Sequence, residues 1–328
     1  MFGIFNKKKT QLIKKQDYFG FFGKHQIQAD FIKHQINSRE SIALDNWLQE
    51  GVAAVARAKR SDSVEFARQS LFFMAGGPEE SALIGMLSPS KDNIGRNYPF
   101  VNFVFVSNTD YKTQPAFLFL LESYCLQHVT SVHDKLLQSQ SRQAMEAVIQ
   151  EQEMTARQLM QCGDIADAIQ QLRKVPMSQF WQALEYGNVD QRARLINELS
   201  NILSSIANRG CLRTQYGLRL PMPTDWQSAT LVAAFWLNLI TNAVADHNWQ
   251  PWVFYQFATT TQAASLVVFC RPVPASYFDA IYLPEQLGTS VIDLTNLNQS
   301  VPFTNTAMDL AVADNMSIFD ALRSWSKV

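Results

Sequence analysis

The sequence predicts an α/β protein in which two units of strands and helices flank a helical middle segment. Three patterns support this prediction. Apolar residues recur at three- and four-residue steps over 39–58, which is typical of an amphipathic helix. The run 100–106 is almost entirely apolar and rich in β-branched and aromatic residues, which favours a buried strand. Residues 138–171 are glutamine-rich and consist mainly of helix formers.

The first α/β unit is predicted over 18–137, after a basic leader at 1–17. Trp47 and Leu48 lie on the apolar face of its first helix. Its predicted elements follow the order of the chain: a helix at 39–58, strands at 71–74, 82–87 and 100–106, and a helix over 115–136. The length of 328 residues leaves room for a second domain after it.

The middle segment, 138–210, is predicted to be helical, with Gly210 ending its last helix. The second, smaller α/β unit is predicted over 211–328. Thr224 is predicted to cap a long helix that runs to residue 244, as part of a capping box. The other predicted elements are strands at 213–220, 252–257, 264–270 and 291–294 and a short helix at 276–283.

The composition excludes several classes of protein. Hydrophobic residues make up 47% and charged residues 17%, which is globular composition. The net charge of −1 provides no basic surface, so nucleic acid is not an expected partner. The most apolar stretch, 229–245, is interrupted by polar residues and falls short of the roughly 20 residues that a transmembrane segment needs. A buried helix is predicted there instead.

The first residues and the cysteines predict a cytoplasmic protein. The leader 1–17 has lysines but lacks the apolar core of a signal peptide. Two interpretations of it remain: a solvated, frayed segment, and a weak peripheral contact with anionic lipid. The four cysteines are scattered without a Cys-x-x-Cys pair, which indicates reduced thiols rather than disulfides or a zinc site.

Sequence signatures of catalysis are absent. There is no Walker loop, no Gly-x-Gly-x-x-Gly and no Gly-x-Ser-x-Gly. None of the five histidines has metal-like spacing to a second ligand. No nucleophile–base pair is evident from the order of residues. The sequence therefore predicts a protein that is not an enzyme and that holds no cofactor or metal.

One group of polar and charged residues could nevertheless form a site. Lys24 and Asp30 lie near the first glycine-containing turn, and Ser90, Asp92 and Arg96 lie in a second loop. Three interpretations remain open if the two loops meet. The residues form an anion- or nucleotide-binding site or active site, or they structure their own loop, or they belong to a surface that binds a partner protein.

The loop-structuring interpretation makes specific predictions. Asp92 should cap backbone N–H groups of its own turn, and Gly95 should supply a positive φ angle. Arg96 should pair with a carboxylate from another part of the N-terminal unit, because its planar guanidinium matches carboxylate geometry. Asp30 is the leading candidate for that carboxylate.

Three sequence blocks carry a resemblance to a known family. Residues 21–32 are similar to an aromatic-Gly-Lys-Leu-Pro-x-x-Gly-Asp-Phe-Val opening, with His25 and Gln26 in place of Leu-Pro and Ala29 in place of Gly. Residues 44–51 are similar to a Trp-Asp-x-Trp-Leu-Gln-x-Gly helix, and 85–100 to a Gly-Val-x-x-Pro-Ser-x-Asp-x-x-Gly-Arg-x-Phe-Pro block. In order and spacing the blocks resemble the TagF family, also called ImpM, of bacterial type VI secretion systems. The residues that form the core of this family motif are Phe22, Gly23, Phe31, Trp47, Leu48, Pro89, Pro99 and Phe100.

The resemblance implies a fold and a function. The N-terminal unit is expected to be a three-layer α/β sandwich. The whole protein is expected to be a cytoplasmic accessory protein that acts after translation through protein–protein interaction, usually as a repressor of assembly. The implied partner is Fha, the scaffold that carries a forkhead-associated domain, or another cytoplasmic component of the secretion system.

Overall fold

The computed structural model describes residues 18–59, 68–76, 81–106, 114–159, 164–246, 249–283, 290–297 and 304–325. The predicted basic leader, 1–17, with its proposed lipid contact, lies outside these residues. The strands of the N-terminal unit are β1 (Tyr18–Gly23), β2 (Ile32–His34), β3 (Ser70–Met74), β4 (Ala82–Ser88) and β5 (Phe100–Val106). Those of the C-terminal unit are β6 (Gly217–Pro221), β7 (Trp252–Gln256), β8 (Ser265–Phe269) and β9 (Val291–Asp293).

These strands form one mixed sheet in the order β2-β1-β5-β4-β3-β7-β8-β6-β9. The two predicted units are joined within it, because β3 pairs with β7 in an antiparallel register that places Phe72 opposite Phe254. Neighbouring strands run antiparallel throughout, apart from the parallel pair β6–β9. The fold is therefore α/β, as predicted, with both units contributing to a single sheet.

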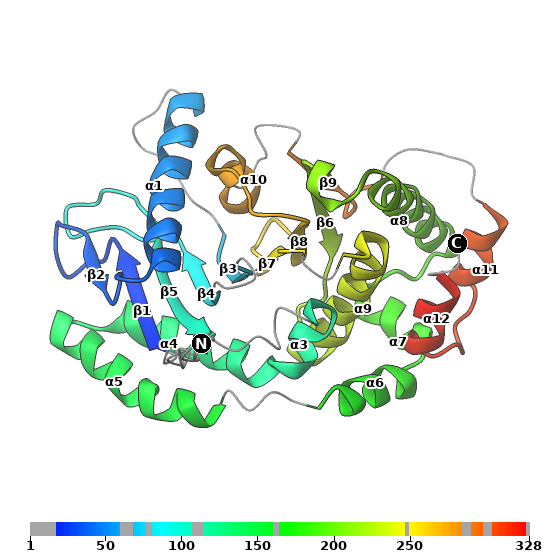
Figure 1. Cartoon of the computed structure of the whole chain (residues 1–328), viewed down its shortest axis with the longest axis horizontal. Helices are drawn as coiled ribbons and strands as arrows, with labels where there is room; N and C mark the ends of the chain where they lie inside the picture. Colours follow the sequence, from blue (N-terminus) through cyan, green and yellow to red (C-terminus); the bar gives the residue numbers. More distant parts are fainter. Residues whose placement is uncertain are drawn as a thin grey trace, which may run out of the picture.

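Helices cover both faces of the sheet. The longer ones are α1 (Arg39–Lys59), α4 (Ser123–Gln138), α5 (Arg142–Leu159), α8 (Val189–Arg209) and α9 (Trp226–Val244). The shorter ones are α3 (Leu118–Leu121), α6 (Ile165–Lys174), α7 (Met177–Ala183), α10 (Phe278–Tyr282), α11 (Asn305–Ala311) and α12 (Ile318–Trp325). Figure 1 shows α1 and α10 on one face, and α4, α5 and α9 on the other.

The strands supply a separate core to each face, because successive side chains of a strand point in opposite directions. Phe72, Phe103 and Phe254 pack toward α1 and α10. Phe73 and Val104 pack toward the opposite helices. The architecture is thus the three-layer sandwich implied by the resemblance, and it extends beyond the N-terminal unit to the C-terminal one.

Some predicted boundaries differ from the structure. The helix predicted over 115–136 is broken at Glu122 into a 3₁₀ turn, α3 and α4. The break has a packing cause: α3 and the turn lie against α9, whereas α4 lies against β4 and β5. The N-cap of α9 is Asp225 rather than Thr224, since the Asp225 carboxylate accepts a hydrogen bond from the Ser228 N–H at 2.8 Å.

Helix α9 occupies the most apolar stretch of the chain and is buried on nearly all sides, as predicted. Gly210 ends α8, also as predicted. Among the helices of the described residues, none combines the length and the apolar character that crossing a membrane requires.

Candidate functional site

Two loops meet at one end of the sheet, and together they are called the two-loop site below. The first, 24–31, follows β1, and the second, 89–99, connects β4 to β5. The sheet brings them together because Gly23 and Ser88 both lie opposite Phe100, on its two sides. This adjacency was predicted only conditionally, since the order of strands decides it.

Asp92 is the centre of the two-loop site. Its Oδ1 accepts hydrogen bonds from the backbone N–H groups of Ile94 at 3.1 Å and Arg96 at 2.8 Å. Its Oδ2 accepts one from Arg96 Nε at 2.7 Å and forms an ion pair with Lys24. A carboxylate offers about four acceptor positions, so these donors fill it. Asp92 and Lys24 are both buried, and their contact cross-links the two loops.

The surroundings of Asp92 keep it charged. Burial by itself would raise its pKa. The hydrogen bonds from Lys24 and Arg96 outweigh burial and hold the pKa of Asp92 well below its usual range. The carboxylate is therefore an ionic anchor for the two loops across the whole physiological pH range.

Arg96 pairs within its own loop, which corrects the prediction that Asp30 is its partner. The positive φ of Gly95, +86°, turns the chain so that Arg96 returns to Asp92. The rest of its guanidinium reaches the first loop, where Nη2 donates to the Ala29 carbonyl at 2.5 Å. The Asp30 side chain is exposed and makes no ion pair within the described residues.

Ser90 contributes through its backbone. Its carbonyl accepts a hydrogen bond from the Tyr98 N–H at 3.0 Å, closing the base of the second loop.

The interpretation as an anion- or nucleotide-binding site needs cations that are available to a ligand. Lys24 is buried against Asp92 and so is used within the chain.

Most residues of the core of the family motif are buried. Phe22, Leu48 and Phe100 are fully enclosed, and Trp47 and Pro99 are buried as well; Pro89 is half-buried. Gly23 has a φ of +129°, and a Cβ atom there would lie 2.2 Å from the Pro99 carbonyl oxygen. Glycine at this position allows the end of β1 to approach the second loop closely.

Phe31 is the exception, because 45% of it is exposed. It precedes β2 rather than belonging to the sheet, and its ring meets Tyr98 edge-on at 4.7 Å. The Lys24 ammonium lies 5.3 Å from the ring centroid on its face, a cation–π contact. The side chain therefore covers the two-loop site instead of entering a core.

A buried polar chain that sequence analysis missed lies behind the site. His133 Nε2 lies 2.7 Å from Ser88 Oγ, and His133 Nδ1 lies 2.5 Å from Asn102 Oδ1. Because the Asn102 oxygen only accepts, Nδ1 carries the proton and Nε2 accepts from Ser88. The three residues come from α4, β4 and β5, so their spacing gives no signal. One clue was available: an asparagine within an otherwise apolar strand.

This Ser–His–Asn order is that of nucleophile, base and orienting group in acyl-transfer enzymes. All three side chains have 0% exposure, so no substrate can touch Ser88 in this structure. Burial lowers the pKa of His133 to about 3, so the ring is neutral at physiological pH. These three hydrogen-bonded side chains link α4 to the strands that carry the second loop.

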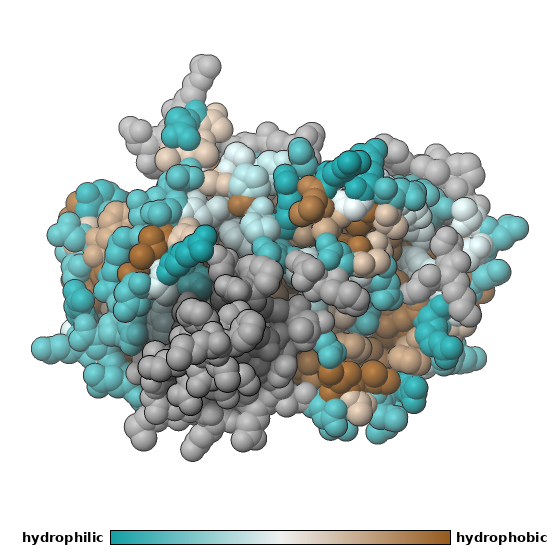
Figure 2. Space-filling view, in the orientation of Figure 1, coloured by the Kyte–Doolittle hydropathy of each residue, from teal (hydrophilic) through white to brown (hydrophobic). Residues whose placement is uncertain are grey.

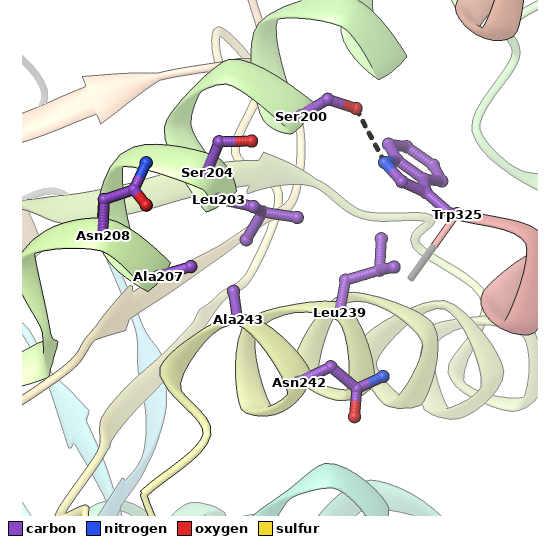
Figure 3. Close-up of a pocket in the computed structure, with 9 residues that line it drawn as sticks. All are labelled: Ser200, Leu203, Ser204, Ala207, Asn208, Leu239, Asn242, Ala243 and Trp325. Carbon is purple, nitrogen blue, oxygen red and sulfur yellow. Dashed lines mark hydrogen bonds between the residues drawn. The ribbon is translucent and has the colours of Figure 1, made fainter. Parts of the chain in front are cut away.

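A separate cavity of about 300 Å³ lies between α8 and α9, away from the two-loop site (Figure 3). Its lining is uncharged and consists of Ser200, Leu203, Ser204, Ala207, Asn208, Leu239, Asn242, Ala243 and Trp325. The Trp325 indole N–H donates to Ser200 Oγ at 2.8 Å, at one end of the cavity. No acid, base or cation faces this space. Elsewhere in the described part of the chain, no group of three or more His, Cys, Asp or Glu residues could hold a metal ion.

Comparisons with known proteins place the two-loop site within a described module. Residues 20–171 match the family model of the TagF N-terminal domain, described as type VI secretion system-associated. The crystal structure of PA0076 from Pseudomonas aeruginosa PAO1 is similar, with 15% sequence identity and a TM-score of 0.44, over 87% of this chain and 100% of that chain. A search of curated proteins gives no match.

Proposed function

We propose that this chain is a cytoplasmic accessory protein of a type VI secretion system, because its residues 20–171 match the family model of the TagF N-terminal domain. It acts after translation, by protein–protein contact, and restrains assembly of the secretion apparatus. Its partner in this role is the forkhead-associated-domain scaffold Fha. The family match, which covers both loops of the two-loop site, is the observation that carries the proposal.

The geometry of the site supports a binding role rather than a chemical one. The carboxylate of Asp92 is filled by internal donors, and Lys24 is buried against it. The Ser88–His133–Asn102 chain is enclosed. The site exposes part of Phe31, Ile94 and the outer part of Arg96, beside the charged side chains of Asp30 and Lys91. Such a mixture of apolar and arginine surface is typical of protein interfaces.

Overproducing the protein in a strain with a constitutively active secretion system should reduce the amount of tube protein in the medium. The cellular level of tube protein should stay constant, because the effect follows translation. Immunoblots of the medium and of the cells measure both quantities. An empty vector and overproduction of an unrelated protein of similar size are the controls.

A pull-down with purified chain and purified Fha measures the contact directly. Retention of Fha by the chain, together with lower secretion, supports the proposal. Unchanged secretion and no retained Fha would remove the repressor role and the proposed partner together.

A further inference from the structure

We propose that Ile94 and Phe31 are the anchors through which the two-loop site docks on its partner, and that the partner offers an apolar pocket with a carboxylate at its rim. This inference rests on the proposed function and adds the surface and the chemistry of the contact. The buried ion pair of Lys24 and Asp92 has a different task, since it fixes the two loops.

Exposure together with a position on the two loops distinguishes these two side chains. Ile94 is 64% exposed and Phe31 is 45% exposed, and both lie on the two loops within the TagF N-terminal domain. The other large apolar side chains exposed in the described residues are Ile42, Tyr124, Leu212, Met308 and Val312. Most of the Ile94 side chain lies outside the core. Burying it against a partner would remove apolar surface from water, which favours binding.

Rigidity is the second feature. The Ile94 N–H is held by Asp92 Oδ1 at 3.1 Å, and Asp92 is ion-paired with Lys24, whose ammonium lies over Phe31. Both anchors are therefore one contact away from the same buried ion pair. The second loop is also closed by hydrogen bonds from Gly95 N to Asp92 O at 3.0 Å and from Asp92 N to Arg96 O at 3.1 Å. Loops that are ordered before binding lose little conformational freedom on binding.

The charges around the anchors indicate the chemistry of the partner. Lys91 is exposed, and Arg96 is exposed beyond its contacts with Asp92 and Ala29. Arg96 Nη1 makes no hydrogen bond to any described residue, so it keeps donors for a partner. Asp30 is the exposed carboxylate of the site, and Lys91 and Arg96 are its exposed cations. The exposed surface of the site therefore carries a net positive charge. A carboxylate beside an apolar pocket would complement this surface.

The test uses serine variants of the two anchors and a matched control outside the site. Ile94→Ser and Phe31→Ser are compared with Leu212→Ser, because Leu212 is 75% exposed but lies beyond the TagF N-terminal domain. Calorimetry measures the affinity of each purified full-length variant for purified Fha, and thermal melting verifies folding. Each anchor variant should bind Fha more weakly than the wild type, by about tenfold or more. The control variant should bind as the wild type does.

A charge variant tests the carboxylate. Lys91→Glu should weaken binding, and raising the salt concentration should weaken binding of the wild type, because exposed charge pairs are screened. If the wild-type chain binds Fha and Ile94→Ser, whose melting is unchanged, binds equally well, the docking surface is wrong while the proposed function stands. If the wild-type chain does not bind Fha, the proposed function and this surface both fail.

Discussion

Replacing His133 by phenylalanine is expected to lower the free energy of unfolding by about 2–6 kcal/mol. Phenylalanine keeps a ring in the space but leaves Ser88 and Asn102 buried without their hydrogen-bond partner, and each such group costs about 1–3 kcal/mol. Urea denaturation of the purified protein measures the change.

His128 provides the matched control, because it lies on the same helix and is only half-buried. Its Nε2 has no hydrogen-bond partner among the described residues. His128→Phe should therefore change stability by less than about 1 kcal/mol. Equal losses in the two variants would show that the ring volume matters and that the polar chain does not.

The same histidine should make the protein acid-sensitive above the range in which carboxylates titrate. The ordinary pKa of about 6.5 falls to about 3 in the folded state, so the unfolded chain binds more protons between these values. The contribution of His133 to the free energy of unfolding is then complete above pH 6.5. It is lost as the pH falls, and the loss reaches about 2 kcal/mol at pH 5. His128 contributes in the same direction, since burial also lowers its pKa.

The contribution of Asp92 appears in a different pH window. Its pKa is lowered, so its stabilisation is present above its ordinary value of 3.8 and is lost only below that pH. Urea denaturation of the wild type and of His133→Gln at pH 7 and pH 5 separates the two groups. The pH 7 to pH 5 loss should shrink by about 2 kcal/mol in the variant. An identical loss in both proteins would rule out His133 as its source.

Gly23→Ala is expected to be the second severe substitution, with a loss of about 2–6 kcal/mol. An alanine there must adopt a φ of +129° and place its Cβ 2.2 Å from the Pro99 carbonyl oxygen, which belongs to the backbone. Relief of this clash separates β1 from the second loop and so opens the two-loop site. The melting temperature should fall, and, under the proposed function, the affinity for Fha should fall with it.

Gly95→Ala separates strain from crowding. Gly95 also has a positive φ, +86°, but nothing lies within 4 Å of the added Cβ. Its cost should be limited to the backbone preference, about 1–2 kcal/mol. If Gly23→Ala is no worse than Gly95→Ala, the close contact with Pro99 is not what makes glycine necessary.

Elements with a one-sided or wholly apolar pattern were predictable from the sequence. Helix α1 and strand β5 lie where the spacing of Leu44, Trp47 and Leu48 and the apolar run 100–106 placed them. The pairing of β3 with β7 was not predictable, because both strands are almost entirely buried on both faces. Such strands carry no alternation that would select one neighbour over another.

In the two-loop site, too, local features were predictable and long-range contacts were not. Local chemistry gave the turn around Asp92 and the positive φ of Gly95, since both depend on residues within five positions. The predicted contact of Arg96 with Asp30 was wrong, because Arg96 pairs with Asp92. The hydrogen bonds of His133 to residues of two strands were not predicted. The exposure of Phe31 was not predictable from its place in the motif, because it depends on where the chain turns.

The junction of β3 and β7 limits how the chain can be divided. The matched module ends at residue 171, yet its outermost strand on that side, β3, is completed only by β7, at residues 252–256. A fragment cut after the module would expose a buried strand, SLFFM, as a free sheet edge with unpaired backbone groups. Such edges template aggregation. The second half of the chain therefore covers an edge strand of the first, and we expect the two halves to unfold together.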